Sequence, residues 1–132
     1  MRVLSGSVVV FCLGLPVFAF AEDDKALTPA EAIKMADKKV TVQMVVRSSK
    51  NALAGRQEIY LDSEEDFRDE KNLAVVITAE GAEKFKEVGI DNPAEHFRGK
   101  TIRVNGTVTR KDDRPRIEIS DPKAIRLIEP KK

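Results

Sequence analysis

Thiols and aromatic rings are what this sequence has least of. Its 132 residues include one cysteine, one histidine, one tyrosine, six phenylalanines and no tryptophan. Cys12 has no partner for a disulfide, and with His96 it cannot complete the ligand set of a zinc site. A disulfide framework and a structural zinc site are therefore excluded, and the core has to be built from aliphatic side chains.

An excess of charge of one sign is also lacking. The chain has 23 lysines and arginines against 22 aspartates and glutamates, which gives a formal net charge of +1. The charged residues are interspersed, which is typical of a solvated surface. No overall positive charge points to a nucleic acid, so an anionic partner would have to be bound by a local cluster.

The N-terminus carries the one long apolar run. A short basic start precedes apolar residues up to Phe18, which are too few for a membrane-spanning helix. Small residues at Ala19 and Ala21 precede an acidic run that begins at Glu22. This order predicts a secretory signal peptide over residues 1–21, cleaved after Ala21. We therefore expect a periplasmic or secreted protein with no stable membrane insertion; an uncleaved anchor is the alternative.

Cleavage after Ala21 would shorten the chain that folds. It removes Cys12 and 21 of the 132 residues, which leaves 111. A chain of that length can fold as one domain. We expect residues 22–37 to form a lead-in with a short helix, residues 38–128 to form the domain, and residues 129–132 to be a basic tail.

Capping patterns predict short helices. Thr28 precedes a proline and, three residues on, a glutamate, which predicts a capping box and a helix over residues 29–36 with Ile33 and Ala36 on its buried side. Such a box satisfies backbone N–H groups that a helix start leaves unpaired. We therefore expect the helix to begin at Pro29.

Two more helical segments are expected further along the chain. Residues 79–88 place Phe85 and Val88 on one face and end before Gly89, which suits the position after a helix C-cap. Asn92 is followed by a proline and a glutamate, which predicts one further helical turn. Both segments lie between the third and fourth predicted strands.

Apolar residues that alternate with polar ones indicate a β protein. The segments 48–56 and 62–72 read as loops, the second of them acidic. The predicted fold is all-β with short helices, a five-stranded Greek-key barrel with a helix between strands 3 and 4, which is the element order of an OB-fold. The predicted strands are residues 40–47, 57–61, 73–77, 101–110 and 114–119.

A motif in the second half of the chain supports this fold. Gly99 and a lysine lead into an alternating strand with Gly106 and Val108; a Pro-Arg-Ile strand and an Asp-Pro pair at Asp121 follow. The chain resembles OB-fold modules of exported bacterial proteins, a nucleic-acid-binding-like superfamily, over most of residues 38–128. The resemblance implies the fold but no particular ligand, because OB-folds bind oligonucleotides, oligosaccharides and proteins.

Basic residues gather in the segments that form the binding face of such a barrel. Single-strand binders combine a basic groove with several stacking aromatic rings. Tyr60 is the only aromatic residue predicted on this face, because Phe67, Phe85 and Phe97 are predicted to lie in the core. In the alternative interpretation the arginines pair with Glu58 and Glu118 on a solvated surface. The candidate ligand-binding residues are Arg47, Lys50, Arg56, Tyr60, Arg110, Lys111, Arg114 and Arg116.

Catalytic and metal-binding patterns are weak. The acidic stretch that starts at Asp62 has Phe67 where an EF-hand loop needs glycine, and no serine lies near His96 in sequence to suggest a triad. We therefore expect no enzyme, no metal and no cofactor. The hypothesis is an exported non-catalytic binding module with a protein partner. The alternative is a binder of single-stranded nucleic acid or anionic oligosaccharide, through the face of strands 2 and 3 and the loops between strands 1–2 and 4–5.

Overall fold

The computed structural model describes residues 26–128. The predicted signal peptide, its cleavage site after Ala21 and the basic tail lie outside the described residues. The elements in chain order are α2 (Pro29–Ala32), β1 (Lys39–Val45), β2 (Ser48–Ala52), α3 (Leu53–Arg56), β3 (Glu58–Asp62), β4 (Ala74–Thr78), α4 (Ala79–Glu87), α5 (Pro93–Phe97), β5 (Thr101–Lys111), β6 (Arg114–Ile119), the 3-10 helix η2 (Pro122–Ala124) and β7 (Ile125–Leu127).

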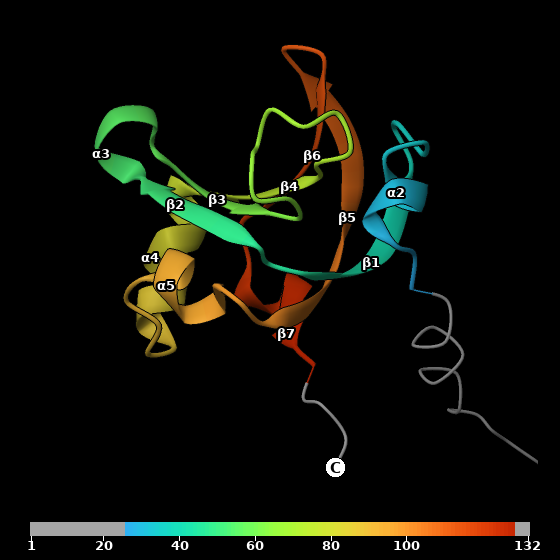
Figure 1. Cartoon of the computed structure of the whole chain (residues 1–132). Helices are drawn as coiled ribbons and strands as arrows, with labels where there is room; N and C mark the ends of the chain where they lie inside the picture. The colour runs from blue at the N-terminus through green and yellow to red at the C-terminus, as the bar shows by residue number, and fades with distance from the viewer. Residues whose placement is uncertain (1–25, 129–132) are drawn as a thin grey trace, which may run out of the picture.

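The strands form one curled sheet in the order β1-β5-β6-β4-β3-β2, with β7 paired to β5. All the pairs are antiparallel except β4–β6. The two strands at the ends of this order are consecutive in the chain. Val46 N still donates to Lys100 O on the β5 side at 2.9 Å, whereas Arg47 N donates to Asp62 O of β3 at 2.9 Å. The two end strands of the sheet, β1 and β2, are thus connected directly by the chain (Figure 1).

This topology is an OB-fold, and the predicted fold class is confirmed. The strand count differs from the prediction because the first strand continues as β2 through the segment predicted to be a loop. Ser48–Ala52 pairs with β3 over its full length, but its side chains are exposed or half-buried on both faces, so no alternation marked it. A short strand, β7, also extends the sheet beside β5.

The core is aliphatic, as the composition requires. Val104 and Ile117 are fully buried, which confirms their predicted inward orientation. Gly106 lies opposite Val40, near the point where β5 leaves β1 and begins to pair with β6. A Cβ atom there would lie 2.4 Å from Ile117 Cγ2, so only glycine allows the two strands to approach.

The predicted capping box is confirmed, but the first helix is shorter than predicted. Thr28 accepts from Glu31 N, and the Glu31 carboxylate accepts from Thr28 N. The helix ends at Ala32, and Ala36 is exposed instead of buried. The chain has to turn toward β1 here, and Asp37, with φ of 68°, donates its N–H to Val108 O at 2.6 Å.

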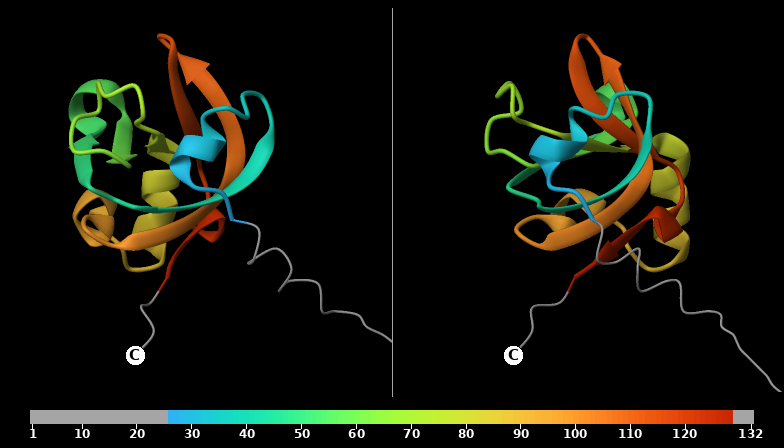
Figure 2. Two further views of the ribbon diagram at one scale, coloured as in Figure 1. Left: turned by 45° about the vertical axis from the view of Figure 1, so that its right-hand side comes forward. Right: turned by 90° about the vertical axis from the view of Figure 1, so that its right-hand side faces the viewer.

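Helices α4 and α5 close one end of the barrel, and the β5–β6 hairpin projects at the opposite end (Figure 2). Phe85 and Phe97 are buried, and their rings meet edge to face at 6.0 Å. Val88, predicted to share a helical face with Phe85, is the C-cap of α4 and is 61% exposed, so it does not follow Phe85 into the core. None of the helices among residues 26–128 has the length and apolar character needed to cross a bilayer.

Candidate ligand-binding groove

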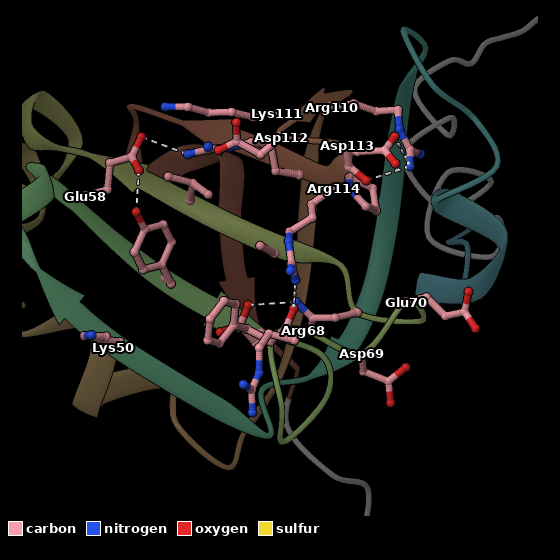
Figure 3. Close-up of a pocket in the computed structure, with 18 of the residues that line it drawn as sticks. Lys50, Glu58, Arg68, Asp69, Glu70, Arg110, Lys111, Asp112, Asp113 and Arg114 are labelled. Atoms are coloured by element: carbon pink, nitrogen blue, oxygen red, sulfur yellow. Dashed lines mark hydrogen bonds and ion pairs between the residues drawn. The ribbon is translucent and has the colours of Figure 1, made fainter.

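A groove of about 970 Å³ lies on the outer face of the β2–β3–β4 part of the sheet (Figure 3). Its residues come from the sheet, from α3, from the β3–β4 loop (residues 63–73) and from the β5–β6 hairpin. The lining residues are Lys50, Arg56, Glu58, Tyr60, Asp62, Phe67, Arg68, Asp69, Glu70, Asn72, Ala74, Val76, Arg110, Lys111, Asp112, Asp113, Arg114, Pro115 and Arg116.

Alternate residues of β3 form the floor of the groove. Every second residue of β3 faces the groove, namely Glu58, Tyr60 and Asp62. Strand pairing sets Tyr60 between Lys50 of β2 and Val76 of β4. The intervening β3 residues, Ile59 and Leu61, are fully buried in the core, so one short strand supplies both the barrel interior and the groove.

Two walls rise from this floor and touch one another. One is the β3–β4 loop and the other is the β5–β6 hairpin (Figure 3). Arg114 Nη1 donates to Phe67 O at 3.0 Å, and its guanidinium carbon lies 5.4 Å from the centroid of the Phe67 ring. Arg68 approaches the same ring at 6.0 Å. The phenyl ring is thus held on the groove wall by cation–π contacts.

Seven of the eight candidate residues predicted from the sequence line this one groove. They come from five elements: β2, α3, β3, β5 and β6. Arg47 is the exception, because it is exposed at the junction between β1 and β2 and does not line the groove. Tertiary folding therefore brings together basic residues that lie up to 66 positions apart, from Lys50 to Arg116.

The sequence predicted the β3–β4 loop but not that its side chains line the groove. Phe67 was predicted to lie in the core, but it is 58% exposed and lines the groove, so that prediction is wrong. The loop leaves the sheet after Asp62, and β4 begins at Ala74. Phe67 lies in this loop, on the lining of the groove instead of in the interior. The sequence contained a signal of this exposed position, since Phe67 is the only apolar residue in the polar and charged segment 62–72. Arg68 also lines the groove and was not a candidate.

A hydrogen-bonded network neutralises the centre of the floor. Tyr60 Oη donates to Glu58 Oε1 at 2.6 Å, and Arg116 Nη2 donates to Glu58 Oε2 at 2.8 Å. Arg116 Nε lies 3.5 Å from a Glu118 oxygen. The pairing of Arg116 with both glutamates agrees with the alternative interpretation of the arginines as structural partners. Because Arg116 is buried and paired, it is the least available cation of the groove.

The network shifts the titration of its members. Burial raises the pKa of Glu58, but hydrogen bonds from Tyr60 and the adjacent charge of Arg116 outweigh burial, so the pKa lies below its usual value of 4.5. Burial and the hydrogen bond to Glu58 raise the pKa of Tyr60 above 10.0. At neutral pH, Glu58 is therefore a carboxylate and Tyr60 a hydrogen-bond donor.

A buried carboxylate, Asp62, lies at the base of the loop. Asn72 Nδ2 donates to its Oδ1 at 3.0 Å, and Asn72 Oδ1 accepts from Glu64 N at 2.9 Å. Ser63 Oγ in turn accepts from Leu73 N at 2.9 Å. These bonds close the loop. Burial raises the pKa of Asp62 above its usual 3.8, and the Asn72 bond opposes that shift only in part.

The available cations lie at the rim. Lys50, Arg56 and Lys111 are exposed, and none of them forms an ion pair with another described residue. Lys50 and Lys111 belong to strands on different sides of the groove (Figure 3). The lining as a whole holds seven cationic and six carboxylate side chains, which gives a formal charge of +1.

Residues 26–128 hold no group of three or more side chains placed to ligate a metal ion.

No protein-family model and no curated protein sequence matches the chain. Among solved structures, asparaginyl-tRNA synthetase from Pyrococcus horikoshii is similar at a TM-score of 0.49 and 16% identity, over 80% of this chain and 23% of that protein.

Aspartyl tRNA synthetase from Entamoeba histolytica is similar at a TM-score of 0.49 and 12% identity, over 74% of this chain and 20% of that protein. The chain therefore spans about a fifth of the length of these synthetases. The strand order and pairing of the chain itself identify the OB-fold.

Proposed function

We propose that this protein is an exported, non-catalytic OB-fold module that holds an extended anionic polymer in the groove. One observation supports the proposal above all others. Seven basic or aromatic residues, predicted as a binding face from five separate elements, line a single concave surface. The face of OB strands 2 and 3 and the adjoining loops is also where this fold commonly binds oligonucleotides and oligosaccharides.

The placement of charge suits a ligand that lies across the sheet. The rim cations Lys50, Arg56 and Lys111 form no ion pair with another described residue, although Arg56 interacts with the Tyr60 hydroxyl and the charge of Lys111 acts on Glu58. They can therefore meet anionic groups without breaking an internal ion pair. Tyr60 on the floor and Phe67 on the wall offer two rings to flat ligand groups. The arrangement suits several weak contacts along a chain better than one enclosed small molecule.

The remaining parts of the proposal rest on the sequence and on the groove chemistry. Export rests on the predicted signal peptide of residues 1–21. A non-catalytic role is favoured because no histidine, serine or cysteine is among the described residues that line the groove. The two floor carboxylates, Glu58 and Asp62, are each held by a structural hydrogen bond. The protein partner favoured by the sequence alone stays an untested hypothesis.

The experiment is a titration of the mature protein with a fluorescent oligothymidylate and a heparin-derived oligosaccharide at low and physiological salt. We expect at least one polymer to bind, with affinity that falls as salt rises. The double variant Arg56→Ala/Tyr60→Ala should lose about tenfold or more in affinity. The control Lys86→Ala removes the same charge from α4, away from the groove, and should change little.

The groove carries both charges, so we expect its affinity for oligothymidylate to be weak. For oligothymidylate we expect a Kd no tighter than about 10⁻⁴ M at physiological salt, the weak end of contact with phosphates alone. Absence of binding by both polymers at low salt would contradict the proposal and leave a protein partner as the hypothesis to test. Equal losses in the double variant and in Lys86→Ala would also contradict it, because the groove would then not be the site.

A further inference from the structure

The groove contains almost as many carboxylates as cations. Six acidic side chains line it, two on the floor and four on the walls. A net charge of +1 gives little attraction for a ligand that carries a charge on every unit, because each phosphate that approaches a rim cation also approaches a carboxylate. Two of these carboxylates are much closer to a groove cation than a Debye length, Glu58 to Arg116 at 2.8 Å and Asp113 to Arg110 at 3.4 Å, so salt screens those pairs only weakly.

The floor carboxylates keep acceptor sites for a ligand, because Glu58 accepts one internal hydrogen bond at each oxygen and Asp62 accepts one in all from the described residues, whereas an ionised carboxylate can accept about four. Glu58 and Asp62 flank Tyr60 on the same face of β3, and two residues of a strand span about 6.6–6.8 Å. Asp62 is only 6% exposed, and among the described residues only Asn72 donates to its carboxylate. A buried carboxylate oxygen gains from a donor, and an ionised carboxylate can only accept.

Hydroxyl groups supply such donors at close intervals along a sugar chain. A sugar ring also has an apolar face of C–H groups that can pack on the rings of Tyr60 and Phe67. An occasional carboxylate or sulfate on such a chain would meet the unpaired rim cations, Lys50 and Lys111 among them. A sparsely anionic, hydroxyl-rich ligand thus satisfies the acids, the bases and the rings together.

We propose that the polymer bound in the groove is an anionic oligosaccharide with widely spaced charges, and that Glu58 and Asp62 accept hydrogen bonds from its hydroxyl groups. This inference rests on the proposed function, of which it specifies the ligand class. It also gives the floor carboxylates opposite effects on the two kinds of polyanion. They attract hydroxyl donors on a sugar chain and repel phosphates on a nucleic acid.

The test compares two probes, a hyaluronan oligosaccharide with one carboxylate per disaccharide and an oligothymidylate of equal length. The variants are Asp62→Asn and Glu58→Gln, which keep side-chain shape and remove one negative charge each. Both should weaken hyaluronan binding by about threefold to tenfold. Both should strengthen oligothymidylate binding by about twofold to fivefold. Thermal melting of each variant checks that it is folded.

The control Glu87→Gln removes the same charge from the exposed surface of α4, outside the groove. It should shift both probes slightly and in the same direction. Binding of oligothymidylate without binding of hyaluronan would overturn this inference and leave the proposed function standing. Tighter binding of both probes by the floor variants, or no change for either, would also overturn it. Failure of wild type to bind any polyanion would remove the proposed function itself.

Discussion

Asp62 is a carboxylate that lines the groove, and its burial disfavours the ionised form that can only accept hydrogen bonds. Its pKa is raised by burial, so the folded state binds the proton more tightly than the unfolded state does. The stability from this side chain is therefore fully present below the ordinary value of 3.8, and it is lost as pH rises through the raised value. At neutral pH the ionised carboxylate destabilises the fold.

Asp62→Asn should consequently raise the free energy of unfolding at neutral pH, because the uncharged amide oxygen can still accept from Asn72. The advantage over wild type should shrink as pH falls below the raised pKa and be absent below 3.8. Urea denaturation over a pH series measures both effects. The exposed residue Asp91 offers a matched control as Asp91→Asn. A gain that is independent of pH would contradict the role of ionisation.

Gly106 is required by the packing of two strands. Gly106→Ala would bring a Cβ atom to 2.4 Å from Ile117 Cγ2, so we expect a loss of about 1–3 kcal/mol from overpacking. The combination with Ile117→Ala should cost less than the sum of the single changes, since Ile117→Ala removes the clashing methyl group. Urea melts of the four proteins give this coupling.

Gly55 is the matched control for that experiment. Nothing lies within 4 Å of a Cβ atom at Gly55, which belongs to the short helix α3. Gly55→Ala should therefore leave stability unchanged or raise it slightly, because alanine favours a helix. Equal losses for Gly106→Ala and Gly55→Ala would show that the clash with Ile117 is relieved by movement of the strands.

Among the elements, the β5–β6 hairpin combines residues that line the groove with an unfavourable turn. Asp112 and Asp113 connect the strands with φ of 54° and 64°. A two-residue hairpin turn with both φ values positive favours Asn-Gly and Asp-Gly, so Asp112 suits its position, whereas Asp113 stands where glycine is preferred. Arg110 donates to Asp113 O at 2.9 Å, so the turn also orients an arginine of the groove.

We expect Asp113→Gly to raise stability by about 0.5–1 kcal/mol, because glycine adopts positive φ without strain. The ion pair between Asp113 and Arg110 that it removes is exposed, at 3.4 Å, and contributes little. Asp113→Ala removes the same carboxylate without relieving the backbone, and it should not stabilise. Equal gains from the two variants, measured by thermal melting, would assign the effect to charge instead of backbone strain.

The β3–β4 loop was harder to predict than the strands around it. The polarity of residues 62–72 correctly indicated a loop, but where its side chains lie depends on how the loop returns to β4. Asn72 and Asp62 are close in space because the loop closes on itself, and Arg114 reaches Phe67 from 47 residues away. Local periodicity contains no information on contacts of that range.

At the scale of the whole molecule, we predict that cleavage of residues 1–21 converts the precursor into the mature protein. Because Ala19 and Ala21 form a small-x-small site before Glu22, the protein recovered from the cell envelope should begin at Glu22. Intact-mass measurement decides this. Retention of residues 1–21 in the envelope form would contradict the predicted cleavage, and it would keep Cys12 in the mature chain.

The sequence by itself determined the aliphatic core, the OB-fold and seven of the nineteen residues that line the groove. Alternation and capping are local properties, and strands that alternate can bury only one face, which is why Val104, Ile117 and the capping box at Thr28 were predictable. Only the tertiary structure decided that the basic residues converge. It also decided that Phe67 and six carboxylates share their groove, because strand order and loop closure set those distances.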